Sequence, residues 1–227
     1  MSDTDESDSD FSEDDAEFMA EMREKRIKDS KARAMAPIKI IKGAHLSHDV
    51  LKGIVQTFNR NPQARVCIAD YIARGSEINA MLRSGDYKIY KSTITCLDEH
   101  AVPLKTLLKT TEPYTILYRS MQTEYSPESS IGYTSTADRL LTGFGKYWMK
   151  IYIPTSVKVL VGDITDAVKT PLSSDKITTY EIILPRGLQL LDVGKVGNTT
   201  YYAALGDDED VMVDMIEQIK SYVRNGV

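Results

Sequence analysis

The sequence predicts an α+β protein, in which helices come first, strands follow and one further helix closes the chain. Apolar residues recur at helical spacing between Ser47 and Leu107. From Tyr114 onward, short runs rich in β-branched and aromatic residues are separated by Pro, Gly, Ser and Asp. Helices grouped before strands are typical of the α+β class, whereas regular alternation of the two would predict a parallel sheet.

Three helices are expected before the strands. Ser47 precedes an apolar pattern that runs to Phe58, and Asn61 with Pro62 ends it. The second helix is indicated by Val66, Ile68, Ala69 and Ile72, and the third by Ile78, Ala80, Met81 and Leu82 before Gly85. A further apolar set leads to the first strand and consists of Ile94, Leu97, Leu104 and Leu107.

Six apolar segments in the second half have the composition of strands. They are Tyr114–Tyr118, Trp148–Ile153, Val157–Val161, Tyr180–Leu184, Leu188–Val193 and Thr199–Leu205. The closing segment, Val211–Val223, carries methionine and isoleucine at helical spacing, which we interpret as a helix that packs on the core.

Charge divides the chain into an N-terminal tail and a domain. Residues 1–35 contain 12 acidic and 6 basic residues, a net charge of −6, and subtracting this from the chain's −5 leaves +1 for the remainder. We expect residues 1–35 to be a largely disordered acidic tail with a basic helical stretch, and residues 36–227 to fold as one domain. The tail is either a solubility, packaging or partner-docking device or simply a solvated leader.

Several classes of protein do not fit this sequence. No apolar run approaches the roughly 20 residues that span a bilayer, and the acidic N-terminus does not resemble a Sec signal peptide. Cys67 and Cys96 lack metal or redox spacing, so buried thiols in a reducing compartment are expected. No metal site, Walker loop or basic stripe with interleaved aromatics is present, although the basic stretch between Arg23 and Arg33 leaves nucleic-acid contacts open.

Three polar groups stand out because each is carried by an apolar strand. Arg119 lies in the run Tyr118-Arg119-Ser120, hydroxyls lie in the run from Tyr133 to Thr136, and Glu181 opens a strand that ends in Pro-Arg-Gly. Singly, each is most often an ordinary surface or strand residue. Together, a guanidinium, a hydroxyl and a carboxylate could bind a dinucleotide phosphate, bind a ribose hydroxyl and stabilise a developing positive charge. These are the groups that chemistry on NAD requires.

The order of these motifs resembles the ADP-ribosyltransferase exotoxin family, in its Arg-Ser-Glu class. The resemblance extends from about Asp70 to Val193. It includes Tyr71 followed by the run from Ile78 to Arg83, and Phe144-Gly145-Lys146 ahead of the Trp148 strand, which is similar to the family's phosphate–nicotinamide loop. The resemblance implies N-terminal helices, two packed and mostly antiparallel sheets, and a C-terminal helix.

The same resemblance implies roles in NAD binding. Arg119 would pair with the NAD phosphates, and Ser120 would offer its backbone to the nicotinamide amide. Phe144 and Lys146 would cover nicotinamide and phosphate, and Ser135 and Tyr71 complete the expected binding set.

Glu181 would be the catalytic residue, stabilising an oxocarbenium-like state through the ribose 2′-hydroxyl. Thr134 would orient Glu181, and Thr179 stands where the family has a Glu or Gln that activates the acceptor. Thr179 cannot act as a carboxylate base, so an arginine acceptor is not implied. Gly75 stands where the family often has an aromatic residue, and Tyr71 is the candidate to replace it.

We therefore predict an NAD-dependent mono-ADP-ribosyltransferase that modifies a macromolecule, with a protein the expected acceptor and nucleic acid left open. One alternative is an NAD glycohydrolase, in which water is the acceptor. Another is a catalytically silent nucleotide-binding or virion interaction protein of the same fold. The expected setting is the cytoplasm of the producing, host or target cell, for a bacterial or bacteriophage effector that a virion could carry.

Overall fold

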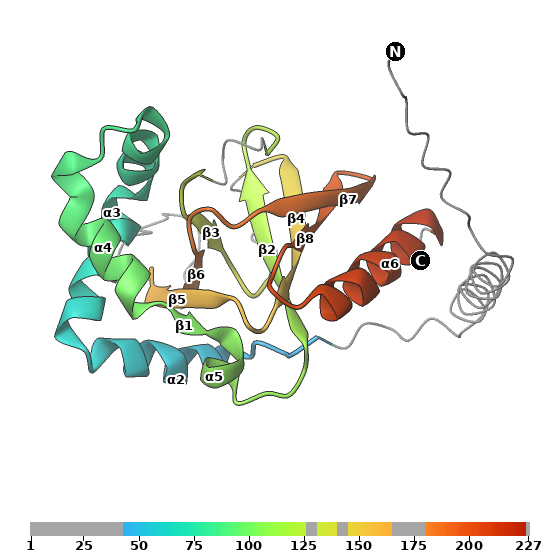
Figure 1. Ribbon diagram of the computed structural model, residues 1–227, viewed down its shortest axis with the longest axis horizontal. Helices are drawn as coiled ribbons and strands as arrows, with labels where there is room; N and C mark the ends of the chain where they lie inside the picture. The colour runs from blue at the N-terminus through green and yellow to red at the C-terminus, as the bar shows by residue number, and fades with distance from the viewer. Residues whose placement is uncertain (1–42, 126–130, 140–144, 165–179, 226–227) are drawn as a thin grey trace, which may run out of the picture. The chain divides into compact units, whose positions relative to one another are not determined.

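A computed structural model describes residues 43–125, 131–139, 145–164 and 180–225 (Figure 1). These residues belong to one compact unit. The predicted tail, and with it the predicted boundary between tail and domain, lies outside the described residues, as do Phe144 and Thr179. None of the described helices is both long enough and apolar enough to cross a membrane.

Among the described residues, four α-helices precede most of the strands. They are α2 (His48–Asn59), α3 (Pro62–Ser84), α4 (Lys91–His100) and the short α5 (Leu104–Leu108), with a 3₁₀ turn, η1 (Lys88–Tyr90), between α3 and α4. Ser47 caps α2, since its hydroxyl accepts from the Val50 N–H at 3.3 Å.

The second and third predicted helices form a single helix, α3, with a break inside it. Asn61 caps α3 by accepting from the backbone N–H groups of Gln63 and Ala64, and Pro62 occupies the first helical position, where its missing N–H is not needed. Arg74 leaves helical geometry, with φ −133°, which accounts for the two separate apolar patterns. Gly85 ends the helix in the left-handed conformation, with φ 77°.

The strands of the described segments form two four-stranded sheets. The first has the order β1-β5-β6-β3, built from Val102–Pro103, Lys158–Asp163, Tyr180–Leu184 and Thr134–Thr136. The second has the order β2-β4-β8-β7, built from Tyr114–Met121, Tyr147–Pro154, Thr199–Ala204 and Leu190–Val196. All neighbours are antiparallel except β4 and β8. The predicted α+β class is confirmed; the two-residue strand β1 was not predicted because it is too short to show a period.

Helices cover both sheets (Figure 1). Helices α2 and α3 contact β5 of the first sheet, and α4 packs along α3. The last helix, α6 (Glu209–Asn225), lies on the second sheet, where Met215 and Ile219 pack against tyrosines of β4 and β8. The opposite face of that sheet joins the first sheet and its helices in the main core.

The two sheets are connected directly beside the candidate site. Tyr118 of β2 and Ala137, just after β3, exchange main-chain hydrogen bonds of 2.9 and 2.8 Å. This isolated antiparallel bridge brings the end of β2, which carries Arg119, next to β3. It therefore places residues of both sheets at one junction.

Packing of α6 can be tested with a pair of substitutions on the same helix. Ile219 is fully buried and Val213 is 47% exposed. Ile219→Ala should lower the free energy of unfolding by about 2–5 kcal/mol, because it leaves a cavity, whereas Val213→Ala should cost much less. Urea denaturation measures both, and equal effects would contradict the described packing of α6.

Candidate active site

Arg119 reaches from β2 to β3. Its Nη1 donates to the Ser135 carbonyl oxygen at 2.8 Å. Burial lowers the pKa of the half-buried Arg119 guanidinium, against the electrostatic effects of Tyr71, Glu181 and Tyr125, but an arginine stays charged in proteins. The ion pairs found among the described residues do not include Arg119. The site therefore holds a partly desolvated cation that can receive an anion.

Ser135 and Glu181 lie on the same face of the first sheet. Ser135 of β3 pairs with Ile183 of β6, two residues beyond Glu181, and side chains two apart on a strand share a face. Burial raises the pKa of Glu181, while a hydrogen bond from the Ser135 hydroxyl and the positive charge of Arg119 oppose that rise. A guanidinium, a hydroxyl and a carboxylate from three strands thus interact in one place.

Thr134 does not occupy the position expected from the resemblance. Its side chain points to the face opposite Ser135, where it is 7% exposed, together with Thr136, whose Oγ1 donates to the Ile182 carbonyl oxygen at 2.8 Å. The structure therefore gives Ser135 the place beside Glu181 that was predicted for Thr134. Three successive hydroxyl residues cannot reveal which one faces the site until the register with β6 is known.

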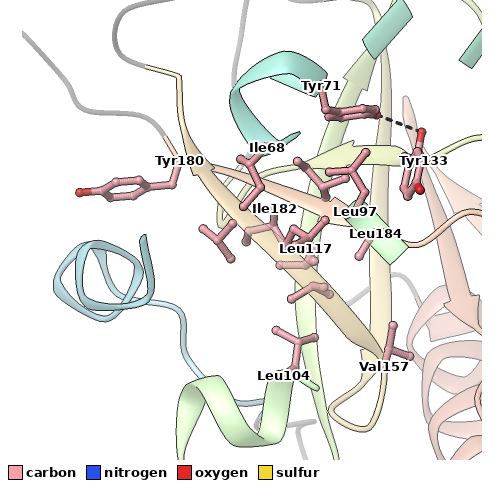
Figure 2. Close-up of a cluster of buried hydrophobic side chains, with 14 of the residues drawn as sticks. Ile68, Tyr71, Leu97, Leu104, Leu117, Tyr133, Val157, Tyr180, Ile182 and Leu184 are labelled. Atoms are coloured by element: carbon pink, nitrogen blue, oxygen red, sulfur yellow. Dashed lines mark hydrogen bonds between the residues drawn. The ribbon is translucent and has the colours of Figure 1, made fainter. Parts of the chain in front are cut away.

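Tyr71 of α3 is hydrogen-bonded to Tyr133, the residue before β3 (Figure 2). The side chain is only 2% exposed, and its hydroxyl lies 3.4 Å from Ser135 Oγ and donates to the Tyr133 carbonyl oxygen at 3.3 Å. The ring also lies within 3.1–3.4 Å of where a Cβ at Gly75 would stand. Tyr71 thus fills the space beside Gly75, and it positions Ser135 rather than presenting an exposed ring to a ligand.

Asn79 fixes the residue that precedes β3. Its Nδ2 donates to the Tyr133 carbonyl oxygen at 3.0 Å, and its Oδ1 accepts from the Tyr133 N–H at 2.9 Å. Gly132 permits this contact, because a Cβ there would overlap the Asn79 amide. The Asn in the predicted helix motif therefore acts through the backbone of β3.

Asp98 of α4 ties β3 to the turn after β6. Its Oδ1 accepts from the Tyr133 hydroxyl at 2.6 Å, and its Oδ2 accepts from Nε and Nη2 of Arg186 at 3.0 and 2.8 Å. Arg186 belongs to the Pro-Arg-Gly run that follows the Glu181 strand. Asp98 was missed by sequence reasoning because no local pattern marks it.

The structure also describes two other predicted binding residues, Ser120 and Lys146. Ser120 alternates with Arg119 on β2 and pairs with Trp148, so its side chain points to the other face of the sheet. Lys146 is exposed directly before β4, with its ammonium 5.1 Å from the centre of the Tyr147 ring. Among the described residues, no group of three or more His, Cys, Asp or Glu side chains could hold a metal ion.

Comparison with known proteins identifies the fold. No protein-family model and no curated protein sequence matches the chain. Among solved structures, the Clostridium limosum C3 exoenzyme superposes with a TM-score of 0.50 over 75% of this chain and 100% of that one, at 13% identity. The chain has the fold of the ADP-ribosyltransferase exotoxins. The fold predicted from the ordered motifs is therefore confirmed.

Two further solved structures match less closely. C3larvin toxin, an ADP-ribosyltransferase from Paenibacillus larvae, has a TM-score of 0.47 and 15% identity over 70% of this chain and 96% of that one. C3stau2 from S. aureus, solved with NAD, has a TM-score of 0.44 and 12% identity over 73% of this chain and 99% of that one.

Removing the Asn79 amide from this ADP-ribosyltransferase fold should release Tyr133. Asn79→Ala should lower the free energy of unfolding by about 1–3 kcal/mol, because the Tyr133 N–H loses its partner and the Tyr133 carbonyl oxygen keeps only the Tyr71 hydroxyl. Ser76→Ala, at an exposed position of the same helix, is the control and should change it little. Equal unfolding energies for the two variants would show that Asn79 does not hold Tyr133.

Glu181→Gln should raise stability at neutral pH. A carboxyl whose pKa is higher in the folded state than in the unfolded state makes folding less favourable as pH rises through that interval. The variant should therefore have the higher Tm at about pH 7–8, and the difference should shrink as pH falls toward the ordinary glutamate value of about 4.3. Glu99→Gln, on the exposed side of α4, is the control. A lower Tm for Glu181→Gln at pH 7 would mean that Arg119 and Ser135 outweigh burial.

Proposed function

We propose that the protein is an NAD-dependent ADP-ribosyltransferase that moves ADP-ribose from NAD to a macromolecular acceptor. The observation that carries this proposal is the convergence of Arg119, Ser135 and Glu181 from β2, β3 and β6. The ADP-ribosyltransferase fold supports it, because the three groups lie at the junction of its two sheets.

Arg119 is the group for the NAD pyrophosphate. Its guanidinium is half-buried and makes no ion pair with a described carboxylate. A planar cation that is always charged binds phosphate oxygens through two parallel hydrogen bonds. Nη1 of Arg119 is held by the Ser135 carbonyl oxygen, so the other N–H groups of the planar guanidinium point in a fixed direction.

Glu181 acts at the ribose. When the bond between ribose and nicotinamide breaks, its electron pair leaves with nicotinamide and positive charge develops on the ribose. A carboxylate that accepts from the 2′-hydroxyl stabilises that charge more strongly in the transition state than in bound NAD. The Ser135 hydroxyl, which lies on the same face of the sheet as Glu181 and 3.4 Å from the Tyr71 hydroxyl, is placed to hold the carboxylate.

A nucleophile of the acceptor then forms a bond to the ribose and loses its proton. We propose a protein acceptor and action in the cytoplasm of a host or target cell, as for an injected or bacteriophage-encoded effector. The acceptor-activating position of the motif is Thr179 in the sequence, which offers a hydroxyl instead of a carboxylate. An acceptor that needs little activation is therefore favoured over an arginine guanidinium, which has to lose a proton before it can act as a nucleophile.

The test follows NAD labelled in its adenine half, incubated with the purified protein in the presence and absence of cell lysate. Wild type should transfer label to macromolecules, and Glu181→Gln should lower the rate by about 10² to 10³-fold, because a preorganised group that stabilises developing charge is lost. Glu99→Gln should retain the wild-type rate, since its side chain is exposed on α4.

Each of the other possible outcomes supports a different alternative function. Label recovered only as free ADP-ribose would replace the transferase with an NAD glycohydrolase. Protease treatment that leaves the label on nucleic acid would reassign the acceptor. Absence of NAD turnover under every condition would contradict the proposal and favour a silent binding protein of the same fold.

A further inference from the structure

Tyr125 lies over the face of the second sheet that carries Arg119. Its ring makes an edge-to-face contact with Tyr202, with ring centres 5.4 Å apart. Tyr202 pairs with Ile151, and Ile151 pairs with Leu117, two residues before Arg119 on β2. Cross-strand partners and alternate residues of one strand share a face, so Tyr202 and Arg119 are on the same side of the sheet.

The Tyr125 hydroxyl is buried and has no hydrogen-bond partner among the described residues. A buried hydroxyl without a partner destabilises a folded protein, because it loses its hydrogen bonds to water. Phenylalanine would keep the ring contact with Tyr202 and avoid that cost. The hydroxyl is therefore not explained by the stability of the ligand-free fold.

Arg119 is the charged group beside this hydroxyl. Burial raises the pKa of Tyr125, and the positive charge of Arg119 opposes the rise, while Tyr125 in turn affects the pKa of Arg119. A guanidinium has only donors, and a phenol has one donor of its own. Both groups can therefore donate to the same partner, an acceptor with several oxygens that lies between them.

We propose that the Tyr125 hydroxyl is a second donor to the pyrophosphate of NAD, acting beside Arg119. This inference rests on the proposed function, since NAD is the ligand that brings the pyrophosphate to Arg119. The hydroxyl, which has no hydrogen-bond partner among the described residues, gains one, a phosphate oxygen, when the nucleotide binds. Tyr125 is thus a binding residue that neither the motifs nor their order revealed.

The test measures NAD binding by calorimetry in the Glu181→Gln background, where turnover is slow, with and without Tyr125→Phe. Loss of one hydrogen bond to a phosphate oxygen should weaken NAD binding by about tenfold. Binding of adenosine, which lacks the pyrophosphate, should be unaffected. Tyr87→Phe, at a position that is 40% exposed between α3 and η1, is the control and should bind NAD like its parent.

Stability of the ligand-free protein gives the second readout. Tyr125→Phe should keep or raise the Tm, because it removes an unsatisfied buried hydroxyl. A lower Tm would overturn the proposal, since the hydroxyl would then have a structural partner in the free protein. Unchanged NAD affinity would overturn it as well, and would leave the proposed function intact provided that the parent binds NAD. A parent that does not bind NAD would remove both proposals together.

Discussion

The two sheets are joined beside the site by the main-chain bridge between Tyr118 and Ala137, and the chemistry depends on this bridge. It aligns the end of β2 with β3, so that Arg119 reaches the Ser135 carbonyl oxygen and the Ser135 side chain faces Glu181. Main-chain bonds hold the strands independently of the side chains that act on a ligand. The site can therefore contain a strained electrostatic arrangement without losing its geometry.

That arrangement opposes the stability of the free protein at three points. The Glu181 carboxylate and the Arg119 guanidinium are both partly desolvated, and the Tyr125 hydroxyl is buried without a partner. Groups arranged in this way favour a ligand that supplies what each lacks, namely a phosphate for the donors and a developing positive charge for the carboxylate. Helices α3 and α4 offset the cost by fixing Tyr133 through Asn79 and Asp98.

Much of the fold could be predicted from the sequence, because apolar periods mark α2, both halves of α3, α6 and the long strands. The ordered motifs also predicted that Arg119 and Glu181 lie in one site. Local patterns could not distinguish Thr134 from Ser135, since that choice depends on the register between β3 and β6. Asp98 and Tyr125 were missed for a related reason. Asp98 accepts a hydrogen bond from Tyr133, which is distant in the sequence, and Tyr125 stands out only because its buried hydroxyl has no partner among the described residues.

The most direct test of the central claim is an experimental structure of Glu181→Gln with NAD bound. We expect the pyrophosphate to contact Arg119 and residue 181 to lie within about 3 Å of the ribose 2′-hydroxyl, a normal hydrogen-bond distance. Ser135 rather than Thr134 should contact residue 181. NAD bound away from the junction of the two sheets would contradict the account. A nucleotide that contacts Arg119 but whose ribose lies on the face of β3 opposite the Ser135 side chain would also contradict it.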